Sequence, residues 1–216
     1  MKPQKKISTI WSPELAYAIG LIATDGCLYN DKRHMAFISK DLQLIKVFMK
    51  CLGLEVKILK KKSGFVGGSF SYWVQFGDVN FYNFLLSLGL TPNKSKTIGV
   101  IKVPDIYFFD FLRGSFDGDG TVYSYYDERW KNSFAFYINF ASASFNHLSW
   151  LRKKIKGFIE IKGSLSKQAY AGAYKLVFAK NDSRLLINKM YYNHTVPRLE
   201  RKYKKAYNIL VKDKKS

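Results

Sequence analysis

The sequence predicts an α+β protein built from two copies of one supersecondary unit. Three observations indicate this: a nonapeptide pattern that occurs twice, a shared order of helical and alternating segments after each copy, and a spacing of about 94 residues between equivalent positions. A whole unit repeated at a fixed period predicts a pseudo-twofold arrangement within one chain. The chain has 216 residues, 47% of them hydrophobic, which is ample for a packed core.

The two nonapeptides are AIGLIATDG, residues 18–26, and LRGSFDGDG, residues 112–120. Each has Asp at its eighth position, Asp25 or Asp119, followed by Gly. The third and seventh positions hold small residues, which are Gly20 and Thr24 in the first copy and Gly114 and Gly118 in the second. Residues four apart share one helix face, and small residues there let two helices approach closely. We therefore expect the two motif helices to pack together at the pseudo-twofold axis.

The first repeat begins with a helix whose start is marked by Ser12 as cap and Pro13 at the first helical position. Gly26 ends this helix, and the alternation and periodicity of the following residues predict the remaining elements. These are two strands within residues 27–39 around an Asn30-Asp31 turn, a helix within 41–54 closed by Gly53, strands at 55–62 and 69–76 joined around Ser63-Gly64 and Gly67-Gly68, and a helix within 79–90.

The second repeat shows the same order, with Asp105 as the expected cap of its motif helix. The expected elements are a helix over residues 106–119, strands at 121–126 and 133–142, a helix at 145–158, strands at 160–167 and 173–180, and a helix at 183–192. A final helix at about 197–211 has no counterpart in the first repeat. We therefore expect an N-terminal repeat over residues 1–98, a connector over 99–104, and a C-terminal repeat over 105–216 that ends in the extra basic helix.

Net charge indicates a polyanionic partner. Lys and Arg number 36 against 16 Asp and Glu, which gives a formal net charge of +20. Both parts of the chain contribute, at +8 before residue 100 (14 basic and 6 acidic) and +12 after it (22 basic and 10 acidic). This balance predicts an extended basic surface rather than a single basic tail, and it favours nucleic acid over an anionic membrane as partner.

The cysteines and the N-terminal segment restrict the class further. Cys27 and Cys51 form no CxxC pair, and with three scattered His residues they indicate neither a zinc site nor a disulfide framework. We expect both to be buried thiols in a reducing compartment. The apolar run over residues 15–23 is too short to span a membrane, and Asp25 follows it closely, so we expect an intracellular protein that is not secreted.

The paired aspartates indicate a metal-dependent chemistry. Close packing of the motif helices brings Asp25 and Asp119 together at the negative ends of two helix dipoles, where their carboxylates repel each other and need a cation. Mg²⁺ accepts one or two protein carboxylates together with phosphate oxygens and waters. On a strongly basic protein this combination predicts hydrolysis of phosphodiesters.

At this point the sequence closely resembles the LAGLIDADG homing endonucleases, in their single-chain form with two repeats. The resemblance rests on the two nonapeptides, their spacing and the order of elements. It implies two four-stranded antiparallel sheets that form a DNA-binding saddle around the motif helices. It also implies that Asp25 and Asp119 are the metal-binding catalytic residues, with Mg²⁺ as cofactor and Mn²⁺ or Ca²⁺ as alternatives. The implied activity is cleavage of both strands of double-stranded DNA across the minor groove, leaving short 3′ overhangs.

The resemblance also concerns residues around the motif. The sixth-position acid is present as Asp117 but is replaced by Ala23 in the first copy, so a symmetrical mechanism does not need it, and we expect a structural role for Asp117. Family members carry a basic residue near the end of the last helix of each repeat, beside the scissile phosphate or its attacking water, which the resemblance assigns here to Lys94 and Lys202. Lys96 and Lys204 are offset alternatives, and a solvated or phosphate-anchoring lysine is the alternative role.

Alternation along the strands predicts which side chains face DNA. We expect the following to point toward the helices: Phe70, Tyr72, Val74, Phe76, Phe134, Phe136, Ile138, Phe140, Tyr174, Leu176 and Phe178. The outward set is then Ser71, Trp73, Gln75, Tyr137, Asn139 and Lys175, several of which can contact base edges, whereas Lys57, Lys60, Lys61, Lys62 and Lys162 suit phosphates. An ordinary solvated strand face is the alternative for each of them.

Two other functions remain open. A non-cleaving nucleic-acid binder on the same scaffold, either an intron RNA-splicing maturase or a DNA-binding regulator, would also explain the charge and the fold. A purely structural basic protein would give the repeated Asp no role. Because the repeats share little sequence, we expect a monomer that binds a long asymmetric DNA site one to one.

Overall fold

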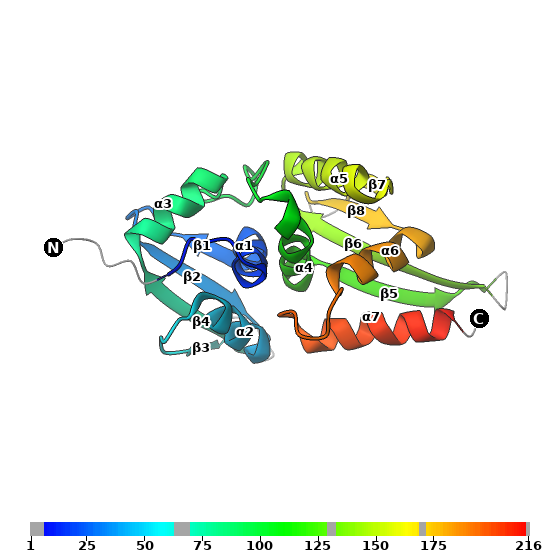
Figure 1. The fold of residues 1–216 in the computed structure, drawn as a ribbon, viewed down its shortest axis with the longest axis horizontal. Helices are drawn as coiled ribbons and strands as arrows, with labels where there is room; N and C mark the ends of the chain where they lie inside the picture. Colours follow the sequence, from blue (N-terminus) through cyan, green and yellow to red (C-terminus); the bar gives the residue numbers. More distant parts are fainter. Residues whose placement is uncertain (1–6, 63–69, 129–132, 169–171, 215–216) are drawn as a thin grey trace.

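The computed structural model describes residues 7–62, 70–128, 133–168 and 172–214, and it shows two α+β halves side by side (Figure 1). The first half contains α1 (Pro13–Asp25), β1 (Gly26–Leu28), β2 (His34–Ser39), α2 (Leu42–Leu52), β3 (Leu59–Lys62), β4 (Phe70–Gly77) and α3 (Val79–Leu88). The second contains η1 (Asp105–Tyr107), α4 (Phe108–Asp119), β5 (Thr121–Tyr126), β6 (Phe134–Ser142), α5 (Phe145–Ile159), β7 (Ser164–Lys167), β8 (Tyr174–Phe178), α6 (Lys180–Met190) and the extra helix α7 (Glu200–Asp213). The predicted order of elements is confirmed in both repeats.

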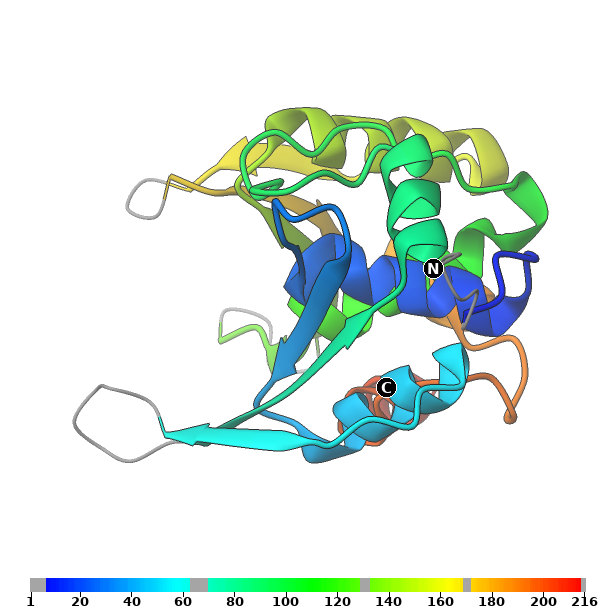
Figure 2. The same ribbon diagram turned by 90° about the vertical axis from the view of Figure 1, so that its left-hand side faces the viewer.

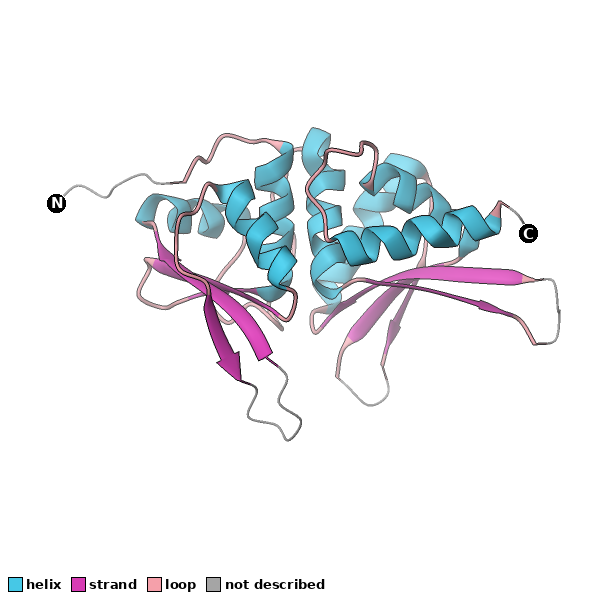
Figure 3. Cartoon of the chain, turned by 90° about the horizontal axis from the view of Figure 1, so that it is seen from below, coloured by secondary structure: helices cyan, strands magenta, loops and turns pink. Residues whose placement is uncertain are grey.

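Each half contains one four-stranded antiparallel sheet. The strand orders are β1-β2-β4-β3 and β5-β6-β8-β7, so the two sheets have the same topology. The registers also correspond, since Phe37 pairs with Val74 in the first sheet as Phe140 pairs with Leu176 in the second. The helices lie on one side of the molecule, and the two sheets diverge from the central helices on the other (Figure 3). The predicted fold class is confirmed.

The two motif helices form the centre of the molecule, where α1 and α4 run side by side (Figure 1). All nine residues from Leu15 to Ala23 are buried, and so are those from Phe108 to Asp117 except Phe109. Neither helix has a solvent-facing side along this length, because each packs against its own sheet and against the other helix. The hydrophobic core is therefore continuous from one repeat to the other.

The start of α1 follows the sequence prediction, whereas the start of α4 differs from it. The Ser12 side chain accepts a hydrogen bond of 3.1 Å from the backbone N–H of Leu15, as an N-cap does. Asp105 does not cap α4: it opens the 3₁₀ turn η1, and Tyr107 takes the N-cap position. The Asp105 carboxylate instead forms an ion pair with Lys154 on α5. The final helix also differs slightly, beginning at Glu200 rather than at Pro197.

The predicted inward-facing residues in the middle of the central strands are confirmed, whereas residues at the starts of β4 and β8 are more exposed than predicted. Val74, Phe76, Leu176, Phe178 and the four alternate residues of β6 are buried. Phe70 was expected inside but is 43% exposed, because β4 begins at the sheet margin, where the Lys60 ammonium group covers the ring at 3.9 Å from its centroid. Tyr72 and Tyr174 are partly buried.

Two further predictions of exposure or burial need correction. Asn139 was expected to be exposed but is 8% exposed, because Thr121 and Val177 flank it on the neighbouring strands. Cys27 was expected to be buried but is exposed, because Gly26 and Leu28 occupy the inward positions of β1 and leave Cys27 on the outer face. Cys51 is partly buried, and burial raises the pKa of its thiol to about 12.

Two further observations complete the fold. The predicted turns at Ser63-Gly64 and Gly67-Gly68 lie outside the described residues. Within the described ranges, no helix combines the length and the apolar character needed to cross a bilayer.

Candidate active site

The site is built on an unusually close approach of two helix backbones. A Cβ atom on Gly20 would lie 2.2 Å from the carbonyl oxygen of Phe111, and one on Gly114 would lie 2.1 Å from that of Tyr17. At the end of the interface, a Cβ on Gly118 would lie 2.0 Å from Oγ1 of Thr24 and 2.8 Å from Oδ2 of Asp25. The missing side chains therefore bring the C-terminal ends of α1 and α4 into contact.

Asp25 and Asp119 are the last residues of α1 and α4, and the carboxyl groups are near enough for the charge of Asp119 to act on Asp25. Asp25 is partly buried and Asp119 is exposed. Burial, together with the negative charge of Asp119, raises the pKa of Asp25 to about 6, and desolvation also raises the pKa of Asp119. Among the described residues, no cationic side chain forms an ion pair with either carboxylate. The charges of Lys94 and Lys202 therefore act on the two acids without a direct ion pair.

The donor set fits a hard cation with few protein ligands. The described residues contain no cluster of three or more His, Cys, Asp or Glu side chains. Two carboxylates that meet beside solvent match Mg²⁺, which keeps several waters and shares its coordination with phosphate oxygens. A closed structural zinc site, with four N or S ligands, does not match them.

Lys94 lies in the turn after α3 and Lys202 in the first turn of α7, and the ammonium group of each reaches the C-terminal end of a motif helix. Their exposed fractions are 6% and 8%. The Lys94 ammonium group donates a hydrogen bond to the carbonyl oxygen of Gly26, and the Lys202 ammonium group donates to that of Gly120 at 2.7 Å. Gly26 and Gly120 are equivalent residues, each directly after a motif aspartate, so the two lysines are related by the pseudo-twofold axis.

The two lysines differ in the number of carbonyl groups that they bind, but both place a positive charge near Asp25 and Asp119. Lys202 also donates to the carbonyl oxygens of Phe116 at 2.7 Å and Gly118 at 3.0 Å, which neutralises the C-terminal end of α4. Burial lowers the pKa of Lys202 to about 8 and also lowers that of Lys94, whereas the nearby Asp25 and Asp119 charges raise both. The offset alternatives Lys96 and Lys204 are exposed.

Comparison with models of protein families gives no match, and neither does comparison with curated proteins. Solved structures do match. The homing endonuclease I-WcaI bound to its DNA recognition sequence is 15% identical, over 92% of this chain and 89% of that chain, with a TM-score of 0.63. The I-LtrWI LAGLIDADG homing endonuclease bound to target DNA is 11% identical, over 92% and 89%, with a TM-score of 0.60. The chain has the LAGLIDADG fold.

The same fold occurs in DUF199/WhiA. The full-length protein from Thermatoga maritima is 18% identical and covers 95% of this chain, with a TM-score of 0.56. This chain spans 63% of that full-length protein but 89% of a structure of the N-terminal LAGLIDADG domain of DUF199/WhiA. The LAGLIDADG fold of the present chain thus occurs in homing endonucleases and also in DUF199/WhiA, whose name does not describe an endonuclease.

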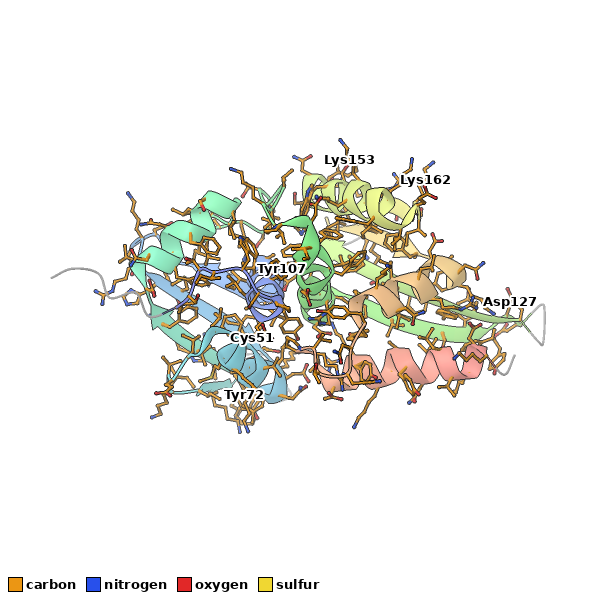
Figure 4. The ribbon with its side chains drawn as sticks, viewed as in Figure 1. Cys51, Tyr72, Tyr107, Asp127, Lys153 and Lys162 are labelled. Atoms are coloured by element: carbon orange, nitrogen blue, oxygen red, sulfur yellow. The ribbon has the colours of Figure 1, made fainter. Side chains whose placement is uncertain are left out.

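The outer faces of the two sheets in this LAGLIDADG fold are suited to a polyanion. None of the residues in the eight described strands is Asp or Glu. Gln75 is exposed, Ser71, Trp73, Tyr137 and Lys175 are partly exposed, and Lys57, Lys60, Lys61 and Lys62 are exposed. Lys162 extends outward from the C-terminal repeat (Figure 4). These lysines would add to the attraction of phosphate groups.

A tyrosine stack distinguishes the second sheet from the first. The ring centroid of Tyr137 lies 5.3 Å from that of Tyr123 and 6.0 Å from that of Tyr125, with interplanar angles of 18° and 11°. Val122 and Phe136 are buried on the helix-packed side, so the stack lies on the outer face. The alternation of β6 predicted that Tyr137 points outward. Its stacking partners on β5 could be identified only from the register between the two strands.

Several residues that hold the site together were missed in the sequence analysis. Arg113, fully buried, donates to the carbonyl oxygens of Pro197 at 2.8 Å and Met190 at 2.7 Å, and it pairs with Asp110 at 2.7 Å. It thereby ties the segment before α7 to α4. A charged residue inside an otherwise buried helix was the available sequence signal, but the two carbonyl groups that it binds lie 84 and 77 residues away in the sequence.

Proposed function

We propose that this protein is a site-specific endonuclease that hydrolyses both strands of double-stranded DNA with a divalent metal. The observation that carries the proposal is the pseudosymmetric set of Asp25, Asp119, Lys94 and Lys202 at the ends of two helices in contact. Two acids and two lysines, one of each per repeat, match a reaction carried out twice, once on each strand.

Asp25 and Asp119 are the groups that would hold the metal, with Mg²⁺ as the expected ion and Mn²⁺ or Ca²⁺ as alternatives. When bound, Mg²⁺ would supply Lewis-acid stabilisation of charge on the phosphate and would favour an ionised attacking water. The two carboxylates would bind the ion in their ionised form. Desolvation raises the pKa values of both acids, and the negative charge of Asp119 adds to the rise at Asp25, which a bound cation would oppose.

Lys94 and Lys202 would contribute fixed positive charge beside the reacting phosphates. Each ammonium group is held by carbonyl oxygens and buried, so its position is set before DNA binds. Preorganised charge stabilises a developing anion more than mobile charge does, because it needs no reorganisation during the reaction. Lys94 donates one of its three N–H groups to Gly26, so another could be shared with a phosphate oxygen or its attacking water. Lys202 donates all three to carbonyl oxygens and would act through its charge.

The proposed substrate is a long, asymmetric DNA duplex bound by a monomer inside the cell. The sheets have equivalent topology but different outer faces, with the tyrosine stack in one and Gln75 with Trp73 in the other. Different faces read different half-sites, so a palindrome is not required. The solved I-WcaI and I-LtrWI complexes, in which the same fold is bound to DNA, support DNA as the partner.

Selection on a randomised duplex library with Mg²⁺, followed by sequencing of the cut ends, tests this function. We expect a single enriched site of two dissimilar halves, cut on both strands with short 3′ overhangs, and no products without metal. Cleavage that persists with chelator, or that shows no sequence preference, would contradict the proposal.

A non-cleaving nucleic-acid binder is the second candidate. The similarity to DUF199/WhiA favours it, since that structure is described by its LAGLIDADG domain and not as an endonuclease. The same library distinguishes the two: a binder enriches uncut duplexes in a retention step, or structured intron RNA in a parallel RNA pool, and gives no cut ends with any divalent metal.

A further inference from the structure

Each lysine of the site lies in a segment that the opposite repeat holds in place. The first case is Lys94, which lies in a turn after α3. Its carbonyl oxygen accepts hydrogen bonds from the backbone N–H groups of Thr97 at 3.0 Å and Ile98 at 2.7 Å. This turn therefore moves as a unit with residues 97–99, and whatever holds Ile98 and Gly99 also places Lys94.

Residues 98 and 99 are held by the first turn of α5, which belongs to the C-terminal repeat. The Ser144 hydroxyl donates to the carbonyl oxygen of Ile98 at 2.5 Å while accepting from the backbone N–H of His147 at 3.3 Å. The Nδ1 atom of His147 lies 2.8 Å from the carbonyl oxygen of Gly99, so Nδ1 carries the proton. Ser144 and His147 are 3% and 5% exposed, which makes these bonds costly to lose.

The second case is Lys202, in the first turn of α7, which is held by α2 of the N-terminal repeat. Gln43 uses both ends of its amide: Nε2 donates to the carbonyl oxygen of Arg198 at 3.0 Å, and Oε1 accepts from the backbone N–H of Glu200 at 3.0 Å. Beside it, Arg201 forms a bidentate pair with Asp41. Figure 2 shows α2 and α7, in cyan and red, next to each other.

The two attachments are equivalent by the pseudo-twofold axis. Helix α2 follows β2 as α5 follows β6, and the N-cap residues are Asp41 and Ser144. Each lysine is thus bound through its ammonium group to its own motif helix and through its backbone to the other repeat. The surroundings of each lysine therefore include contacts from both repeats.

We propose that Gln43 on one side, and Ser144 with His147 on the other, are positioning residues that each place the lysine of the opposite repeat. A lysine side chain has four rotatable bonds, so its ammonium group stays in place only if its backbone is fixed. Displacement of a reacting group by about 1 Å can reduce a rate about 100-fold. The effect on cleavage rests on the proposed function, whereas the crosswise placement of the lysines does not.

Amine acetylation with site-resolved mass spectrometry tests the placement without any activity. In the native protein Lys94 and Lys202 should react slowly, and the exposed Lys96 and Lys204 serve as internal controls. We expect Gln43→Ala to speed labelling of Lys202 about five- to tenfold and to leave the labelling of Lys94 unchanged. A factor of this size corresponds to the net stabilisation that one hydrogen bond contributes. Ser144→Ala should have the opposite selectivity, and Ser144→Thr, which keeps the hydroxyl, should behave like the native protein. Equal changes at both lysines, or no change at either, would overturn the inference.

Strand-resolved cleavage tests the consequence. On a duplex labelled separately on each strand, we expect Gln43→Ala to slow one cut and Ser144→Ala to slow the other, each accumulating a nicked product with unchanged DNA affinity. A general loss of stability would slow both cuts equally and would contradict the positioning role. If the native protein cuts no duplex, the proposed function fails, while the labelling result still decides the placement.

Discussion

The hydroxyl of Tyr17 on α1 donates a hydrogen bond of 2.7 Å to the carboxylate of Asp117 on α4, across the interface between the repeats. Asp117 is 1% exposed and also accepts from the backbone N–H of Leu199 at 2.7 Å and the hydroxyl of Tyr191 at 3.2 Å. Burial raises the pKa of Asp117 to about 6, although the hydrogen bonds from Leu199 and Tyr17 act to lower it. Asp117 therefore joins three segments, and the expected structural role agrees with this geometry.

Asp117→Asn should destabilise the protein. The amide offers one acceptor oxygen where the carboxylate satisfies three donors, so the free energy of unfolding should fall by about 1–3 kcal/mol. Urea unfolding measures this change, with Asp119→Asn as the matched control at the exposed acid. Unchanged stability combined with lost DNA cleavage would instead make Asp117 a catalytic residue.

Asp25→Asn or Asp119→Asn should abolish double-strand cleavage and leave DNA binding largely intact, because each change removes a metal ligand but little surface. Without metal, the melting temperature should stay level or rise, since one of two repelling charges is removed. Gel-shift and cleavage assays on the selected site measure both properties. Cleavage of both strands at the native rate by either variant would refute the metal-site assignment.

The stability difference between Asp25→Asn and the native protein should depend on pH. With the pKa of Asp25 at about 6, the native carboxyl gains a proton as the pH falls through 6, whereas the unfolded chain, with its ordinary pKa of 3.8, does not until lower pH. The penalty of the buried charge is thus present at pH 7 and lost toward pH 4. The gap in melting temperature between variant and native protein, measured without metal, should shrink over this range. A gap that is constant or widens would contradict the raised pKa.

Gly20→Ala should separate the motif helices. The added Cβ would lie 2.2 Å from a backbone oxygen, which cannot move aside as a flexible side chain would. We expect a loss of about 3 kcal/mol or more, at or above the usual range for overpacking. Gly157→Ala on α5 is the control, since nothing lies within 4 Å of its Cβ, and it should stabilise the helix by about 0.5–1 kcal/mol. Similar melting curves for the two variants would rule out a backbone contact at Gly20.

Gln75 and Lys175 should affect base preference in different half-sites. They lie on the equivalent strands β4 and β8 and on the outer faces of different sheets. Gln75→Ala should relax preference in one half-site and Lys175→Ala in the other, each by about 1–3 kcal/mol, as loss of a base contact would. Selection profiles of the two variants measure this. A uniform loss of affinity with a salt slope lower by about one would indicate a phosphate contact, and unchanged profiles would place DNA on another face.

The repeat pattern predicted most of the fold because its signals are local. The small residues of the motif, the helix start at Ser12 and the alternation of β6 each depend on neighbours in sequence, and all three agree with the structure. The errors arose where an environment depends on other elements. Asn139 follows the outward alternation yet is covered by adjacent strands, and Asp105 suits a cap but pairs with α5.

The sequence by itself determined the two-repeat order, the pairing of Asp25 with Asp119 and the basic character of the whole chain, since these follow from spacing and composition. The tertiary structure alone decided which side chains hold the lysines. Ser144 bonds a carbonyl group 46 residues away, and Gln43 bonds an N–H 157 residues away, in the other repeat. No periodicity encodes such partners, because they come together only when the buried faces of α1 and α4 dock and bring the two repeats into one core.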